Sequence, residues 1–205
     1  MHIRDDILRT AAEQFGQLGY HRARLEDVAR ALGMKKGSLY YHIDSKEDLL
    51  FALHDRLIDE LTRNTVAALE QANGVAEQVR AVLRAAIRLI AEHQQEVTVF
   101  LHERHVFNST RWAGIRAKRD AYEQLVTGVL RAGIRSGQVR PLPVPVATKG
   151  ILGMVNWGYQ WLHPDGPFSA NEIADVFADI VLNGLLQPTK TPQRPSRTSR
   201  SEEES

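Results

Sequence analysis

The stretch GYHRARLEDVARALGMKKGSLYYHIDSK, residues 19–46, decides the fold of the N-terminal part of this chain. Apolar residues recur at helical spacing over 25–32 and over 36–43, and Gly33 ends the first of these two segments. Two short helices joined by a glycine turn are the pattern of a helix-turn-helix unit. In such a unit the second helix enters the major groove of DNA, and the first lies across the DNA backbone.

The side chains of this stretch suit phosphate groups and base edges. From Arg22 to His42 five basic residues stand against two acidic ones, which gives the patch about three excess positive charges. Gly37 carries no side chain, so another backbone can approach it closely. We expect the following residues to contact DNA: Arg24, Lys35, Lys36, Gly37, Ser38, Tyr40, Tyr41, His42 and Lys46.

Within this set, Lys36 and Tyr41 are the candidates for reading base edges, whereas phosphate contacts from the others give affinity and register. A structural interpretation stays open beside the functional one. Two tyrosines on a short helix often belong to the core, and surface lysines are often only solvated. The whole-chain charge does not decide between the two, because the formal net charge is +1 at pH 7.

The remainder of the chain also shows apolar residues at helical spacing, and strand signals are nearly absent. We predict an all-α fold of about nine helices. Their expected ranges are 4–18, 25–32, 36–43, 45–71, 75–92, 95–108, 112–136, 146–162 and 169–186. Ser45 with Asp48, and Ser169 with Glu172, are pairs typical of the first turn of a helix.

The pattern divides the chain into three parts. Residues 1–48 are expected to form a three-helix DNA-binding head, residues 49–186 an effector-binding and dimerisation domain, and residues 187–205 a disordered tail. The tail has no apolar residue after Leu186, so burial cannot offset the cost of ordering its backbone.

The composition sets the broad class of protein. With 43% hydrophobic and 25% charged residues among 205, the chain is expected to be soluble and globular. The absence of cysteine excludes disulfides and thiolate chemistry, and it fits a cytoplasmic location. No apolar run approaches the roughly 20 residues that a membrane span needs, so we expect no membrane partner.

A resemblance to a known family rests on two motifs, AAEQFGQLGY at 11–20 and EDVARALGMKKGSLYYHIDSKEDLL at 26–50. Together they resemble the DNA-binding domain of TetR/AcrR transcriptional regulators, over residues 7–53. The resemblance implies a DNA-facing role for Lys36, Gly37, Ser38, Tyr40, Tyr41, His42 and Lys46. Two positions depart from the family pattern. Arg24 stands where Ser or Thr usually caps a helix, and Ile43 stands where an aromatic residue is usual.

A single helix-turn-helix makes too few contacts for a specific site, whereas a dimer places two recognition helices about 34 Å apart. We expect the homodimer to form through the segments 146–162 and 169–186. They carry small residues that admit a close backbone and apolar residues that supply contact area: Ala147, Gly150, Gly153, Gly158, Ile151, Met154, Val155, Trp157, Trp161, Ile173, Val176, Phe177, Ile180, Val181 and Leu185. Packing inside one subunit is the alternative. The TetR resemblance, which implies a four-helix dimer bundle, favours the interface.

An effector pocket is expected among the segments 75–92, 95–108, 112–136 and 146–162, where charged and apolar side chains alternate closely. The candidate binding residues are Phe100, Glu103, Arg104, Phe107, Arg119, Tyr122 and Trp157. An apolar pocket with a basic mouth suits an amphiphilic acid or an acyl thioester. The alternative is that Glu103, Arg104 and Arg119 form ordinary salt bridges between helices.

The segment NWGYQWLHPDGPFSANEIADVFADIVLNGL, residues 156–185, resembles the end of TetR-type regulators that sense acyl-CoA thioesters in fatty-acid or sterol breakdown. The resemblance implies a small-molecule effector of that class.

No metal or cofactor is expected. His102 and His105 share a helix face and His93 lies upstream, but a metal site needs a third ligand from elsewhere. We also expect no enzyme, because the chain has no glycine-rich phosphate loop, nucleophile elbow or HExxH motif. Glu103 with His105 is the only acid/base candidate.

The sequence therefore predicts a ligand-responsive repressor that binds a palindromic operator as a dimer and is released by a hydrophobic or acyl-CoA effector. Two alternatives stay open, a DNA-binding regulator without an effector and a small helical enzyme.

Overall fold

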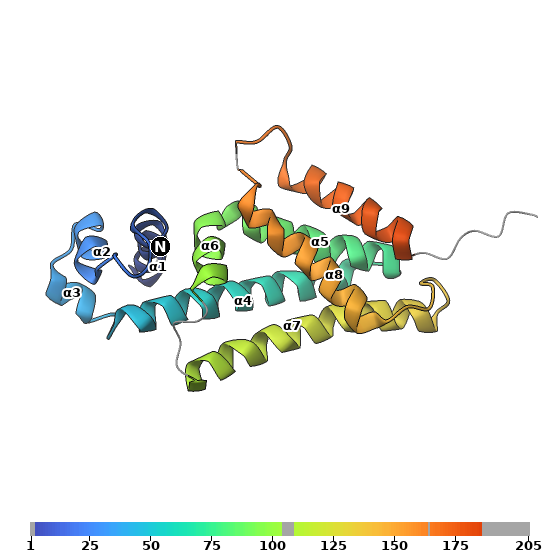
Figure 1. The fold of residues 1–205 in the computed structure, drawn as a ribbon, viewed down its shortest axis with the longest axis horizontal. Coiled ribbons are helices and arrows are strands. Elements are labelled where there is room, and N and C mark those ends of the chain that lie inside the picture. Colours follow the sequence, from blue (N-terminus) through green and yellow to red (C-terminus); the bar gives the residue numbers. More distant parts are fainter. Residues whose placement is uncertain (1–2, 104–108, 164, 186–205) are drawn as a thin grey trace, which may run out of the picture.

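The computed structural model describes residues 3–103, 109–163 and 165–185. Within these ranges the chain is helical and contains no β-strand, which confirms the all-α fold (Figure 1). The helices are α1 (Ile3–Leu18), α2 (Leu25–Ala31), α3 (Lys36–Tyr40), α4 (Lys46–Gln71), α5 (Val75–Glu92), α6 (Gln94–His102), α7 (Ser109–Arg135), α8 (Val144–Asn156), the 3₁₀ helix η1 (Trp157–Gln160) and α9 (Ala170–Leu185).

Helices α1, α2, α3 and the start of α4 form a head at one end of the molecule (Figure 1). Gly19 and Gly33 have φ values of 79° and 66°, in the left-handed region that glycine tolerates, and they end α1 and α2. The Ser45 hydroxyl accepts a hydrogen bond from the Asp48 backbone N–H and begins α4. Ile43 is buried in the head core, so the aliphatic side chain fills this position.

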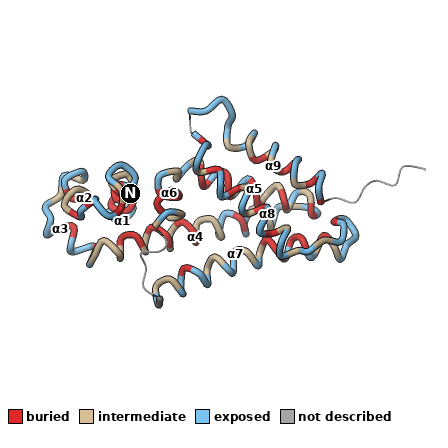
Figure 2. Tube along the Cα trace, viewed as in Figure 1, coloured by how far each residue is buried: buried red, intermediate tan, exposed pale blue. Residues whose placement is uncertain are grey.

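Helix α4 is 26 residues long; it begins in the head and continues into the body, which it forms together with α5 to α9 (Figure 1). Figure 2 shows that the buried residues of the body lie where the helices face one another. α5 packs against both α4 and α9, and its apolar face of Val79, Leu83, Ile87 and Ile90 lies at the centre of this core. The body core and the head core are separate clusters, and α4 contributes residues to both.

Several expected helix limits are wrong: α3 ends at Tyr40 instead of residue 43, α6 ends at His102 instead of residue 108, and α7 begins at Ser109 instead of residue 112. The segment 146–162 is not one helix: α8 begins at Val144, because Pro145 fits the first turn, and it ends at Asn156. The chain then tightens into η1, where Gly158 packs against Ile87 and Ile90 of α5. The tail expected at 187–205 lies outside the described residues. No helix in the described ranges is long and apolar enough to cross a membrane.

Candidate DNA interface and effector pocket

Helix α3 turns one apolar face inward and its polar face outward. Leu39 and Ile43 are buried in the head core, whereas Lys35 to Ser38 and Tyr40 to His42 are exposed. The Tyr41 side chain is 88% exposed and that of Tyr40 is 41% exposed. The interpretation that both tyrosines belong to the core is therefore wrong. The residues predicted to face DNA are therefore exposed, Arg24 included, except Lys46, which is partly buried.

Neither the backbone conformation of Gly37 nor the packing around it requires a glycine at this position. Its φ does not lie in the left-handed region, and a Cβ built on it meets nothing within 4 Å. Glycine inside a helix costs about 1 kcal/mol relative to alanine. Since nothing within the described chain occupies the space beside it, the open side of Gly37 can admit an external backbone.

Lys36 and Arg24 both lie beside α2. The Lys36 ammonium is 2.5 Å from a Glu26 carboxylate oxygen, and the hydrogen bond to that carboxylate raises the pKa of Lys36. Surface ion pairs of this kind contribute little to stability, so the ammonium can exchange its partner at small cost. The backbone N–H of Arg24 donates to Asp27 at 2.9 Å, whereas the Arg24 side chain makes no capping hydrogen bond.

Lys46 is directed into the protein. Its ammonium donates to the carbonyl oxygens of Tyr20 at 2.7 Å, His21 at 3.3 Å and Ala23 at 3.0 Å, and it lies 4.4 Å from the centre of the Tyr20 ring. An ammonium has three N–H groups, which matches the three carbonyl oxygens within hydrogen-bond distance of Lys46. Burial lowers the pKa of Lys46. Its role in joining the loop after α1 to the start of α4 was not foreseen, and its contact with DNA stays a prediction.

The body contains a cavity of about 400 Å³ between α4, α5, α6, α7 and α8. Its walls are mainly apolar, with Leu57, Leu89 and Phe100 among the lining residues. Charged side chains of α7 and α8 also line it: Arg116, Arg119, Asp120, Glu123 and Lys149. An apolar cavity with a few charged groups is typical of a small-molecule site.

The structure brings three of the predicted effector residues together and separates others. Phe100, Arg119 and Tyr122 line the cavity, and the Arg119 guanidinium lies 5.7 Å from the centre of the Phe100 ring. Burial raises the pKa of Tyr122 to about 12, so its hydroxyl stays protonated. Arg104 and Phe107 lie outside the described residues.

Glu103 and Trp157 do not line this cavity, and their part in effector binding stays a prediction. Glu103 follows the end of α6, and its Oε2 lies 3.7 Å from the Nε2 of His21 in the head. Trp157 is 63% exposed, because the chain leaves α8 one residue earlier. Lys149 was missed: it is paired with Glu123 at 2.6 Å, and only the packing of α8 against α7 reveals it.

The sequence analysis also missed His54 of α4, which is fully buried and faces α6. Its Nδ1 lies 2.9 Å from the Leu50 carbonyl oxygen and its Nε2 lies 3.0 Å from the Phe100 carbonyl oxygen. Burial lowers the pKa of His54 to about 4, so the ring is neutral at pH 7. The ring also packs on Phe100, with 4.4 Å between ring centres. His54 therefore connects the cavity wall to α4.

Two domain families match the chain. Residues 7–53 match the bacterial regulatory proteins of the tetR family, and residues 72–185 match the tetracyclin repressor-like C-terminal domain. The chain belongs to the TetR family. This confirms the resemblance seen in the N-terminal motifs and extends it over most of the chain. This TetR-family protein is a DNA-binding transcriptional regulator and not an enzyme.

Several relatives of this TetR-family chain are named regulators. The transcriptional repressor KstR2 of Mycobacterium tuberculosis is 26% identical over 186 residues, which cover 90% of this chain and 93% of the relative. The solved structure of that ketosteroid regulator aligns with a TM-score of 0.84 at 25% identity, covering 91% of this chain and 96% of the other. AibR, solved with isovaleryl coenzyme A and operator DNA, aligns with a TM-score of 0.77 at 29% identity, covering 91% and 99%.

The last part of this TetR-family regulator exposes large apolar side chains. Val146 lies on α8, Val176 and Ile180 lie on α9, and the others lie in η1 and the segment that follows it: Trp157, Trp161 and Phe168. Gly150 and Gly184 each leave room for a Cβ, so a second helix can approach them closely. Other residues expected at the interface are buried within the subunit instead: Ile151, Val155, Gly158 and Leu185.

His102 is engaged within the fold. Its Nε2 lies 2.9 Å from the Tyr159 hydroxyl oxygen, and its expected companion His105 lies outside the described residues. A pair of metal ligands on this helix face therefore has no support from the described part of the chain.

Proposed function

We propose that this TetR-family regulator is a ligand-responsive repressor that binds a palindromic operator as a dimer and releases it when a small amphiphilic effector enters the cavity. The observation that carries the proposal is the cavity of about 400 Å³, whose wall includes Phe100. Phe100 is joined through His54 to α4, which begins in the DNA-binding head.

The proposed DNA contacts come from the exposed face of α3 and its neighbours. Lys36 and Tyr41 read base edges, and the other contacts position the head on phosphates: Arg24, Lys35, Gly37, Ser38, Tyr40, His42 and Lys46. The outward orientation of α3 and the open side of Gly37 support this assignment. The proposed domain limits are residues 1–48 for this head and 49–186 for the remainder, followed by a tail.

The proposed dimer forms through α8 and α9. Their exposed apolar residues give the contact area that a second copy would cover, and the family fold supports a pairing that spaces two α3 helices by about 34 Å. A dimer also doubles the number of phosphate contacts, because a single head makes too few of them for specific binding.

The proposed effector is an acyl thioester. An acyl chain suits the apolar wall around Phe100 and Tyr122, and Arg116, Arg119 and Lys149 attract the negative charge of a coenzyme A group. AibR supports this class, because its solved complex holds isovaleryl coenzyme A. The predicted set also keeps Glu103 and Trp157, which do not line the cavity, and Arg104 and Phe107, which lie outside the described residues.

The proposed release of the operator DNA depends on the position of α6, which contacts both the cavity and the head. Phe100 of α6 lines the cavity, whereas Val99 of α6 packs into the head core. A ligand that displaces Phe100 therefore shifts α6 and α4 relative to the head. The effector must bind the form with misplaced heads more tightly, since only differential affinity changes the equilibrium.

The test is fluorescence anisotropy of labelled DNA from the region upstream of the gene, titrated with the full chain over a salt series. We expect steep loss of affinity with salt and release by acyl-CoA of a defined chain length but not by free coenzyme A. Tyr41→Ala should lose DNA binding while its circular dichroism stays unchanged. If DNA binds and no acyl-CoA releases it or raises the thermal unfolding temperature, the effector assignment is wrong.

A further inference from the structure

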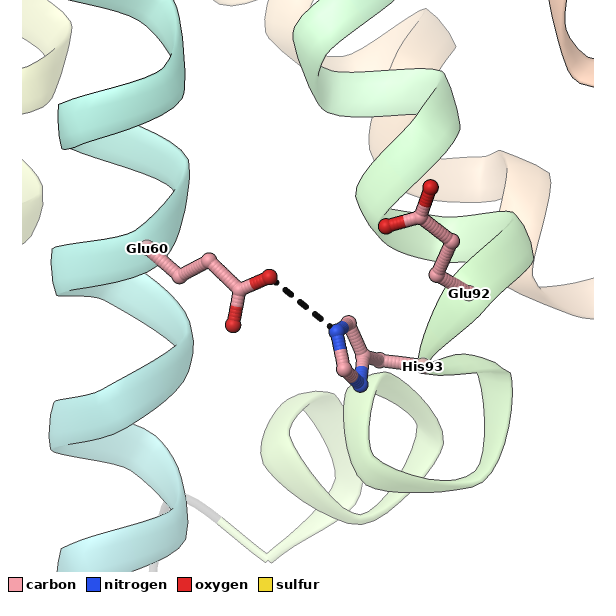
Figure 3. Close-up of side chains that lie close together, drawn as sticks. All are labelled: Glu60, Glu92 and His93. Carbon is pink, nitrogen blue, oxygen red and sulfur yellow. Dashed lines mark hydrogen bonds and ion pairs between the residues drawn. The ribbon is translucent and has the colours of Figure 1, made fainter. Parts of the chain in front are cut away.

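Three metal-ligating side chains meet where α5 turns into α6 beside α4. Figure 3 shows Glu60 of α4 facing His93, with Glu92 at the end of α5 next to them. The ligand atoms of these three side chains all lie within 4.8 Å of one another. Glu92 is exposed, and the side chains of Glu60 and His93 are 24% and 21% exposed. An ion can therefore reach the cluster, and water can complete its coordination.

The donor set suits a first-row transition metal. Two carboxylates and one imidazole are ligands that Zn²⁺ accepts, and three protein ligands plus water are a common Zn²⁺ arrangement. The His93 Nε2 lies 3.2 Å from the Glu60 Oε1. Two ligands of a tetrahedral Zn²⁺ with bonds of about 2.0–2.1 Å are separated by about 3.3 Å, so this pair already has a suitable spacing.

The second nitrogen of His93 has the support that metal-binding histidines need. Its Nδ1 lies 3.5 Å from the Oε1 of Glu96, which is buried and paired with Arg56. Histidines that bind metals usually direct the other ring N–H to a carboxylate, which fixes the tautomer and aims the free nitrogen at the metal. Glu96 and Arg56 lie outside the three-residue cluster and provide this orientation.

The balance of charges around His93 also favours a bound cation. Among the five side chains, Glu60, Glu92 and Glu96 carry three negative charges, and only the guanidinium of Arg56 is permanently positive. A bound dication offsets the remaining excess. It would also join α4 to the corner between α5 and α6, which the His93–Glu60 and Arg56–Glu96 pairs now connect.

We propose that Glu60, Glu92 and His93 form a site for a divalent transition metal of the Zn²⁺ type, supported by Glu96 and Arg56. The site is separate from the effector cavity, because none of these five residues lines that cavity.

The test uses the untagged full chain after removal of metal with a chelator. Calorimetric titration with ZnCl₂ should show one ion per chain, and Co²⁺ should give the visible absorption bands of a low-coordinate site. Zn²⁺ should raise the thermal unfolding temperature, because a ligand that binds only the folded state stabilises it. We expect His93→Gln and Glu92→Gln each to weaken Zn²⁺ binding at least about tenfold.

The exposed residues His163 and Glu70 provide matched controls, and His163→Gln and Glu70→Gln should bind Zn²⁺ as the wild type does. Glu92→Gln keeps the test valid if His93→Gln folds poorly, since Glu92 is exposed. The proposal is overturned if the wild type binds no ion, if Glu92→Gln binds as tightly as the wild type, or if His163→Gln removes the binding.

Discussion

The head and the body use charged side chains in different ways. On the head, the basic and hydroxyl groups of α3 point outward, and the ion pair of Lys36 lies on the surface. In the body, Lys149 is held by Glu123 at the cavity, and Lys118 lies between Asp55 and Asp59. A surface that meets another macromolecule can be built from one short segment, whereas a pocket needs side chains from several helices.

A change at the proposed dimer surface is expected to have the largest effect. Val176→Glu places a charge on the exposed apolar face of α9, where Val176 is 57% exposed. Because a buried unpaired carboxylate in a dimer interface costs several kcal/mol, we expect a monomer by analytical ultracentrifugation and no operator binding.

Val66→Glu is the matched control for this change, since Val66 is also exposed but lies on α4. It should leave the mass and the DNA affinity unchanged. A dimeric Val176→Glu protein would remove α9 from the proposed interface.

The second-largest effect is expected at Gly37, where the open space beside the helix predicts a loss of operator affinity on substitution. Gly37→Glu places a carboxylate where DNA phosphates should lie, and like charges brought together cost several kcal/mol. We expect operator affinity to fall at least about a hundredfold, while the fold stays intact because a Cβ here meets no atom within 4 Å.

Gly128→Glu makes the same change of charge at another glycine with open space, on α7 of the body. Anisotropy should show nearly wild-type affinity for it. Equal losses in the two variants would mean that net charge, rather than the α3 surface, explains the effect.

His54 predicts a pH dependence of stability. Its pKa is lowered from 6.5 to about 4 in the folded chain, so the unfolded chain binds a proton first as the pH falls. The contribution of neutral His54 is fully present above about pH 7 and is lost progressively toward pH 4. We expect a loss of roughly 2 kcal/mol between about pH 7 and pH 5 from this residue.

Urea unfolding at the two pH values measures this slope in the wild type and in His54→Gln, which retains one hydrogen-bond donor. The variant should show a smaller loss on acidification. If both proteins lose the same stability, His54 is not the source.

Lys36→Ala is expected to give the smallest change. Removing one phosphate or base contact costs about 1–3 kcal/mol of DNA affinity, and the slope of affinity against salt should decrease by about one per removed phosphate contact. An unchanged slope with relaxed sequence preference would identify Lys36 as a base reader rather than a phosphate ligand.

The local pattern of residues 25–43 was sufficient to predict the two helices of the head and the turn between them. It left open whether Tyr40 and Tyr41 face the core or the solvent, and only the burial of Leu39 and Ile43 in the structure decides that Lys36 and Tyr41 face outward. Capping at Ser45 was predictable, because its partner Asp48 lies three residues away.

The sequence by itself determined the all-α fold, most of the helices and the family, because these depend on patterns of residues within one or two turns of each other. Only the tertiary structure decided that Lys46 turns inward to three carbonyls, that Trp157 leaves the cavity, and that His54 reaches Phe100 across 46 positions. The physical reason is that contacts between helices depend on crossing geometry and on where each helix ends. The helical periodicity of the sequence specifies neither the crossing geometry nor the residue at which a helix ends.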